Sequence, residues 1–155
     1  MSNFEKNLEQ ALINAKRLTN KILIDGKLIS AQTNNKIPVL NPSTGENIGS
    51  APQCDKNDVN IAVESAHKAF QKWKKIPARE RGKMVAAGAR RLEERKSEIQ
   101  TLLSLDTGNA LRTQAIPETG ASIELTNMFA GLSGELKGEN YPTNIPNSIH
   151  YTTRD

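Results

Sequence analysis

The chain has 155 residues, of which 36% are hydrophobic and 25% charged, and its formal net charge is +4. This length suits one typical domain, and no apolar run approaches the roughly 18 residues that a membrane-spanning helix needs, which excludes an integral membrane protein. The single cysteine, Cys54, cannot form an internal disulfide, which excludes a disulfide-stapled scaffold.

An amphipathic helix is predicted at the N-terminus, over residues 1–20. Ser2 and Glu5 form a Ser-x-x-Glu capping box. Apolar residues then recur at helical spacing on one face: Phe4, Leu8, Ala11, Leu12, Ala15 and Leu18. A mitochondrial presequence is rich in arginine and nearly free of acids, and a secretory signal has a long apolar block. Glu5, Glu9 and the single Arg17 fit neither, so we expect a structural helix in a cytoplasmic protein.

Two β-hairpins are predicted next. Apolar runs flank Asp25-Gly26, a dipeptide that favours a type I′ turn because both of its positions need positive φ. A second pair of strands, over 37–40 and 46–50, encloses the turn sequence Asn-Pro-Ser-Thr-Gly at 41–45. The beginning of the chain is therefore expected to consist of hairpins.

Helical periodicity then predicts a series of amphipathic helices. The first begins with Asp55 as N-cap, the second with Pro77 at its first position, and the third with Ser97 as cap. The third ends at Asp106-Thr107-Gly108, and the last begins near Pro117. In the second helix, Met84, Val85, Ala89 and Leu92 are expected to face inward. The apolar residues at helical spacing are Val59, Ala62, Val63, Ala66, Phe70 and Trp73 in the first helix, Ile99, Leu102, Leu103 and Leu105 in the third, and Ile123, Leu125, Met128, Phe129, Leu132 and Leu136 in the last.

The C-terminal stretch, residues 139–155, differs from the helices before it. Pro142 and Pro146 precede a β-branched and aromatic run at 148–153, which predicts an extended strand. Because a terminal strand has unpaired edges, we expect it to pair with something outside this chain.

Basic residues are concentrated in 68–96, which holds eleven Lys or Arg and three acids. Such a stretch is compatible with nucleic acid or another anionic surface. No aromatic platform interleaves with the cations, which favours a solvated helix face instead.

The residues offer little catalytic chemistry. His67 and His150 are isolated and form no cluster at zinc spacing. The chain has no Gly-x-x-x-x-Gly-Lys-Ser/Thr loop, and its glycines at 131–138 lack the Gly-x-Gly-x-x-Gly spacing. Composition and spacing alone therefore name no activity.

Two side chains remain as candidates. Cys54 would be a nucleophile if a helix start or a cation lowered its pKa, but the neighbouring Asp55 opposes this and no partner is evident. Asp106 lies at the predicted C-terminal end of a helix, where a carboxylate is unfavourable without compensation. A bound cation, an arginine or loop amides would compensate it, and a local Asx turn is the alternative.

Several stretches, taken in order, resemble the aldehyde dehydrogenases that use NAD or NADP. The resemblance covers about residues 22–155 and rests on 24–27, 39–46, 62–73 with 77–81, 92–95, 105–109, 130–132 with 138–139, and 151–154. Its most specific stretches are Asn-Pro-Ser-Thr-Gly-Glu, at 41–46, and Leu-Asp-Thr-Gly, at 105–108.

The resemblance implies an α/β fold. Residues 21–138 would be the first part of a Rossmann-type cofactor-binding domain, with hairpins and helices laid against a sheet whose main strands come later. Residues 139–155 would be the strand region through which the family's subunits form oligomers.

The resemblance also implies an activity: oxidation of an aldehyde to a carboxylic acid with NAD or NADP, through a cysteine thiohemiacetal. The family's catalytic cysteine, glutamate and asparagine, and its cofactor-binding loops, match no position here. We therefore assign no catalytic or cofactor-binding residue. We expect the 155-residue chain alone to be inactive, to bind NAD or NADP poorly, and to be poorly soluble or oligomeric because its apolar helix faces lack a covering sheet.

Some members of that family hold a structural sodium, potassium or magnesium ion. The matching positions here are Asp106 and the backbone carbonyls of Val39 and Leu40, which are oxygen ligands suited to hard cations. Further ligands would come from elsewhere.

Three hypotheses follow. The first is the N-terminal fragment of an aldehyde dehydrogenase. The second is a non-catalytic interaction module of the same ancestry that pairs with another subunit. The third is a basic helical nucleic-acid-binding protein built on residues 68–96.

Overall fold

The computed structural model describes residues 3–153, with side chains from Glu5 onward. The predicted Ser2 cap and the packing of the Phe4 side chain lie outside the described residues. The elements follow in the order α1 (Asn3–Leu18), β1 (Lys21–Ile24), β2 (Lys27–Ser30), β3 (Lys36–Leu40), β4 (Asn47–Pro52), α2 (Lys56–Trp73), α3 (Ala78–Glu94), α4 (Lys96–Thr107), the π-helix η1 (Leu111–Ala115), α5 (Ile116–Gly131), the 3-10 helix η2 (Leu132–Gly134), β5 (Asn140–Tyr141) and β6 (His150–Tyr151).

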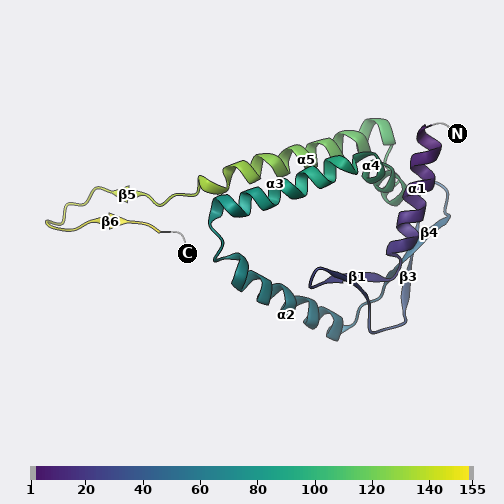
Figure 1. Ribbon diagram of the computed structural model, residues 1–155, viewed down its shortest axis with the longest axis horizontal. Coiled ribbons are helices and arrows are strands. Elements are labelled where there is room, and N and C mark those ends of the chain that lie inside the picture. The colour runs from purple at the N-terminus through teal and green to yellow at the C-terminus, as the bar shows by residue number, and fades with distance from the viewer. Residues whose placement is uncertain (1–2, 154–155) are drawn as a thin grey trace.

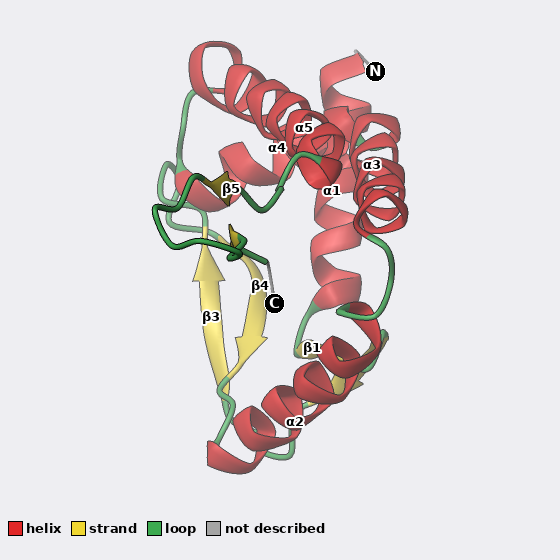
Figure 2. Ribbon diagram, turned by 90° about the vertical axis from the view of Figure 1, so that its left-hand side faces the viewer, coloured by secondary structure: helices red, strands yellow, loops and turns green. Residues whose placement is uncertain are grey.

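The helices and hairpins form an open arrangement. In Figure 1, α3 and α5 run antiparallel side by side, with α4 and α1 at one end and the β5–β6 segment extending from the other. Helix α2 and the β1–β2 hairpin lie apart from α3 and α5. Figure 2 shows α1 on one side of the β3–β4 hairpin.

The strands form three separate antiparallel pairs, β1–β2, β3–β4 and β5–β6. Asp25 and Gly26 have φ values of 52° and 71°, which confirms the predicted type I′ hairpin, since both turn positions are left-handed. The β3–β4 pair also forms as predicted, and Gly45 in its turn has a φ of 74°. Within residues 3–153 no larger sheet connects these pairs.

The predicted helices form, with differences at their starts. Asp55 caps α2 as expected. Pro77 is the N-cap of α3 rather than its first residue. Ser97 is not a cap, because Arg95 alone separates α3 from α4 and α4 has begun by Lys96.

The entry into α5 differs more. Pro117 lies in the first turn of α5, as predicted. The helical conformation begins earlier, however, because the π-helix η1 runs directly into α5, with the Ala115 amide donating to the Ala110 carbonyl. Wide turns of this kind leave little mark on apolar spacing.

Small residues bring α3 and α5 together. Gly82 and Ala89 of α3 and Ala130 of α5 are buried. A Cβ atom at Gly82 would collide with the Ser133 side chain and the Ala130 carbonyl. The α3 face that packs is therefore made of small side chains, and the prediction that Met84, Val85 and Leu92 face inward is wrong.

Most of the predicted apolar helix faces form but remain exposed to solvent. Among the described residues, no large side chain is fully buried. Val63 and Phe70 on α2 are 62% and 53% exposed, and Phe129 on α5 is 62% exposed. This agrees with the expectation that the apolar faces of α2 and α5 lack a covering sheet. None of the helices described is both long and apolar enough to span a membrane.

The C-terminal segment forms its own hairpin. The predicted strand at 148–153 has only two residues, His150–Tyr151, and they pair with Asn140–Tyr141 of the same chain. Pro142, which has no N–H for a ladder, directly follows β5. We call residues 139–152 the arm; its base is closed by hydrogen bonds between Glu139 and Thr152, of 2.9 Å each.

Candidate functional site

A cavity of about 450 Å³ lies between α1, the β3–β4 hairpin and α4. Its walls are mainly apolar and include Leu18 of α1, Ile48 of β4 and Leu102 of α4. Asp106, near the end of α4, and Val39 of β3 also line it. The cavity therefore brings together two of the residues that the sequence marked as cation ligands.

The end of α4 packs against the β3–β4 turn. Gly108 ends α4 in the left-handed conformation, with a φ of 74°, and a Cβ atom there would lie 3.2 Å from the Pro42 Cβ atom. The stretches at 105–108 and 41–46, which are far apart in sequence, are thus neighbours in the fold.

The third predicted ligand residue, Leu40, is not among the residues that line the cavity, and it is 50% exposed. The register of the β3–β4 ladder shifts between Val39 and Leu40, because Val39 pairs with Gly49 and Leu40 with Asn47. Such bulges disrupt the ladder locally. The irregularity therefore falls at the two residues whose carbonyls were expected to bind a cation.

Among the described residues that line this cavity, Asp106 is the one acid. Its carboxylate makes no hydrogen bond or ion pair with the residues that the structure describes, so the arginine and the loop amides considered as compensation are not found there. Among the described residues, no group of three or more His, Cys, Asp or Glu could hold a metal ion. A cation beside Asp106 would therefore depend on carbonyl oxygens.

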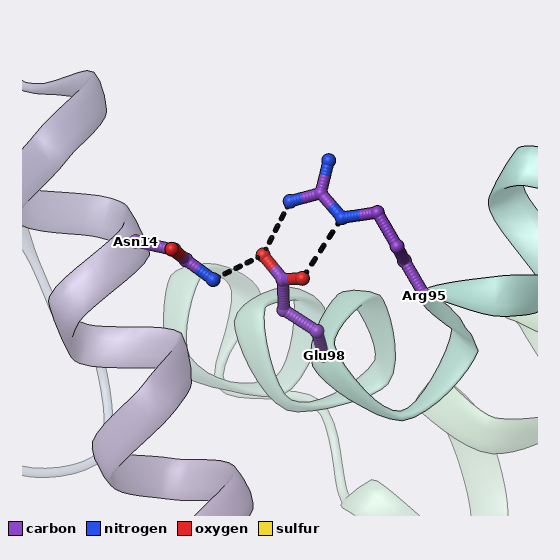
Figure 3. Close-up of polar contacts among 3 residues, drawn as sticks. All are labelled: Asn14, Arg95 and Glu98. Atoms are coloured by element: carbon purple, nitrogen blue, oxygen red, sulfur yellow. Dashed lines mark hydrogen bonds and ion pairs between the residues drawn. The ribbon is translucent and has the colours of Figure 1, made fainter.

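A polar cluster joins α1 to α4 next to the cavity (Figure 3). The Asn14 amide donates a hydrogen bond of 2.7 Å to Glu98 Oε1. Arg95 donates two hydrogen bonds to the same carboxylate, of 2.9 Å from Nε and 2.6 Å from a terminal nitrogen. These three residues fix α4 against α1.

The cluster favours the ionised form of Glu98. The hydrogen bond from Arg95 is the main cause of its lowered pKa, which burial partly opposes, and the charge of Arg95 and the Asn14 amide also favour ionisation. The same contact raises the pKa of Arg95. Sequence reasoning missed this cluster. Asn14, a polar residue amid the apolar spacing of α1, is a signal that could have marked a buried polar side chain, although not its partner Glu98.

The other side chains considered for chemistry remain isolated. Cys54 is exposed, and no side chain in the described part of the chain hydrogen-bonds its thiol. His67 contacts Gln71 on the exposed side of α2, 3.2 Å between the two Nε2 atoms, and His150 lies in the exposed strand β6. Nothing in residues 3–153 resembles a nucleophile with its base.

Four of the eleven cations of the basic stretch form ion pairs, all of them on α3, on α4 or between the two helices. Four ion pairs at i,i+3 spacing link Lys83 to Glu80, Arg91 to Glu94, Arg95 to Glu98 and Lys96 to Glu93. Exposed pairs of this kind are typical of a solvated helix surface, which is the interpretation that the sequence favoured.

Comparison with known proteins identifies relatives along most of the chain. A family model, the aldehyde dehydrogenase family, matches residues 28–155. The aldehyde dehydrogenase tropH of Talaromyces stipitatus is 37% identical over 140 residues, which cover 89% of this chain and 27% of the relative. The phenylacetaldehyde dehydrogenase of Pseudomonas fluorescens is 32% identical over 136 residues, covering 86% of this chain and 27% of the relative. The chain thus spans about 27% of the length of these relatives.

Solved structures are also similar to this chain. Betaine aldehyde dehydrogenase of Staphylococcus aureus in complex with NAD+ superposes with a TM-score of 0.82 at 28% identity, covering 92% of this chain and 28% of the solved one. The HpcC protein of Thermus thermophilus superposes with a TM-score of 0.84 at 23% identity, covering 90% of this chain and 27% of that one. The similarity is to the N-terminal part of these folds.

Proposed function

Because the chain belongs to the aldehyde dehydrogenase family, we propose that it forms the N-terminal part of an enzyme that oxidises an aldehyde to a carboxylic acid with NAD or NADP. In this reaction the nicotinamide accepts a hydride from the aldehyde carbon, and water supplies the second oxygen of the acid. The family match over residues 28–155 is the observation that carries the proposal. The NAD+ complex of the S. aureus neighbour supports the choice of cofactor.

The chain's own part in that enzyme is architectural. Its exposed apolar faces, on α2 and α5, would pack against a nucleotide-binding sheet, which would remove them from water. No residue of this chain is assigned to catalysis or to cofactor binding. By itself, the 155-residue chain neither oxidises aldehydes nor binds NAD or NADP well.

A chimera tests the proposal. The 155-residue chain replaces the aligned N-terminal part of the T. stipitatus relative, and NADH or NADPH formation is followed with phenylacetaldehyde, benzaldehyde and betaine aldehyde. We expect the chimera to reduce the cofactor with at least one of them. There are two controls, and both should be inactive. One is the relative without its N-terminal part, and the other is the 155-residue chain alone.

Two results would contradict the proposal. A folded chimera, with the circular dichroism of the intact relative, that oxidises no aldehyde would show that the chain does not substitute for the family's N-terminal part. Cofactor reduction by the isolated chain would show that it carries catalytic residues of its own.

We also propose that Asp106 and the carbonyls of Val39 and Leu40 contribute to a structural site for sodium, potassium or magnesium. The Asp106 carboxylate, which has no polar partner among the described residues, and the position of Val39 in the same cavity support this. The bound ion would compensate the carboxylate at the negative end of α4.

Residues 139–155 are proposed to make a homo-oligomer contact in a cytoplasmic enzyme. The exposed edges of β5 and β6 and the protruding arm support this contact (Figure 1). The hypotheses of a non-catalytic module and of a nucleic-acid-binding protein are not favoured, since the relatives are aldehyde dehydrogenases.

A further inference from the structure

Helix α1 connects the two walls of the Asp106 cavity. We propose that Asn14, through Glu98, is a positioning residue: α1 holds α4 over the β3–β4 hairpin and thereby keeps Asp106 beside Val39. The functional role of Asn14 rests on the proposed cation site, but the contacts that join α1 to α4 are present without any ion.

One end of α1 is attached to β4. The backbone N–H of Asn20 donates to the backbone carbonyl of Ser50 at 3.0 Å. The Ser50 hydroxyl donates to Oδ1 of the Asn20 side chain at 3.1 Å. Gly49 of β4 faces the same turn, since a Cβ atom there would be in ordinary contact with Thr19 Oγ1, at 3.4 Å. The turn at residues 19–20, directly after α1, is therefore fixed to β4.

The middle of α1 is attached to α4. The Asn14–Glu98 hydrogen bond, of 2.7 Å, joins residues that are 84 positions apart. Both groups are largely shielded, since Asn14 is 9% exposed and the Glu98 side chain 15%. Arg95 holds the carboxylate from the other side with two hydrogen bonds, so Glu98 presents an oriented acceptor to Asn14.

These attachments determine where Asp106 lies. Asp106 follows Glu98 on the same helix by about two turns. The cavity lies between α4 and β4, and the end of α4 meets the hairpin at Gly108 and Pro42. If α1 released α4, the helix would keep its contacts with η1 and α5 but would lose its link through α1 to β4, which helps to hold Asp106 beside Val39.

Helix α1 precedes the stretch that matches the family, which begins at residue 28. The positioning contact therefore joins a helix outside the matched stretch to one within it.

The test uses the full 155-residue chain and two substitutions, Asn14→Leu and Asn14→Ala, so that a failure of one to fold does not end the experiment. Glu93→Gln is the matched control, because it removes an exposed ion pair, with Lys96, at the same α3–α4 junction. Amide hydrogen exchange is measured along the chain. We expect exchange at Leu105–Gly108 to become about tenfold faster in the Asn14 variants, as for loss of one hydrogen bond to a charged group, and to stay unchanged in Glu93→Gln.

A second measurement separates positioning from a general loss of stability. The midpoint of thermal unfolding is measured with sodium, potassium or magnesium chloride and with choline chloride at equal ionic strength. We expect the wild type and Glu93→Gln to gain stability with at least one of the three cations, and the Asn14 variants to lose that gain.

The outcomes are distinct. Unchanged exchange at Leu105–Gly108, or faster exchange spread evenly over α3 and α5 as well, would overturn the positioning role. An equal cation-dependent gain in the wild type and the Asn14 variants would overturn it too. If no cation stabilises the wild type, the cation site fails, while locally faster exchange in the Asn14 variants still supports the positioning of α4 by α1.

Discussion

At the residue scale, Glu98 shows how one carboxylate depends on its surroundings. Arg95 and Asn14 donate hydrogen bonds to it, and these contacts hold its pKa below the ordinary glutamate value. Since the folded state favours the ionised form, ionised Glu98 stabilises the fold. That contribution is fully present above the unfolded pKa, about 4.3, and is lost as the pH falls through the lower, folded value.

The free energy of unfolding of the wild type and of Glu98→Gln should therefore differ with pH. At neutral pH we expect the wild type to be more stable by about 1 kcal/mol, a modest value because Arg95 is half exposed and solvent screens the pair. The difference should shrink as the pH falls below about 4. Urea unfolding at a series of pH values measures it, and a difference that stays constant down to acidic pH would contradict the ionic role of Glu98.

At the element scale, the end of α4 depends on Gly108. Its φ of 74° is costly for any residue with a Cβ atom, and that atom would also press on Pro42. Gly108→Ala should therefore lower the free energy of unfolding by about 1–2 kcal/mol. Gly88→Ala is the control: Gly88 lies within α3 with open space around it, so alanine should stabilise the protein by about 0.5–1 kcal/mol.

Urea or thermal unfolding distinguishes the two alanine variants by the sign of their effects. If Gly108→Ala were as stable as the wild type, the turn at Pro42 would have to yield easily, and the contact between α4 and the β3–β4 hairpin would not be a fixed one.

The elements that could be predicted from the sequence are those with local signals. Asp25-Gly26 determines its turn by backbone conformation alone, and Asp55 caps α2 with its own side chain. The failures depend on context. Ser97 is a plausible cap until Arg95 is seen to join two helices. Packing also places Asp58, which is buried and accepts a hydrogen bond from the Gln32 backbone N–H, in a contact that no sequence spacing reveals.

At the scale of the whole molecule, the exposed apolar surface dominates. The arm carries part of it, with Ile149 and Tyr151 at 76% and 68% exposed. Monomeric proteins rarely expose large contiguous apolar patches. We therefore expect the isolated chain to self-associate.

Ile149→Asp should weaken this association, because a buried charge at an apolar contact is costly. Asn60→Asp, on the exposed surface of α2, adds the same charge outside the arm and should leave association unchanged. Sedimentation velocity over a concentration series measures both. If the wild type and Ile149→Asp associated equally, the arm would not be part of the contact between chains.

The candidate site was accessible to sequence reasoning only in part. The resemblance pointed to Val39, Leu40 and Asp106, and the cavity contains two of them. Which helix faces the cavity, and through which contacts, depends on packing between segments far apart in the chain. The Asn14–Glu98 pair is such a contact, and nothing local to either residue specifies the other.

Gly82 has a consequence for the place where the arm begins. At this glycine α3 touches the backbone of α5. The two helices can pack this closely because Gly82 has no Cβ atom. Helix α5 leads through η2 into residue 139. A larger side chain at position 82 would press on Ala130 of α5 and on Ser133 of η2, so Gly82 constrains the place from which the chain leaves the helices toward the arm.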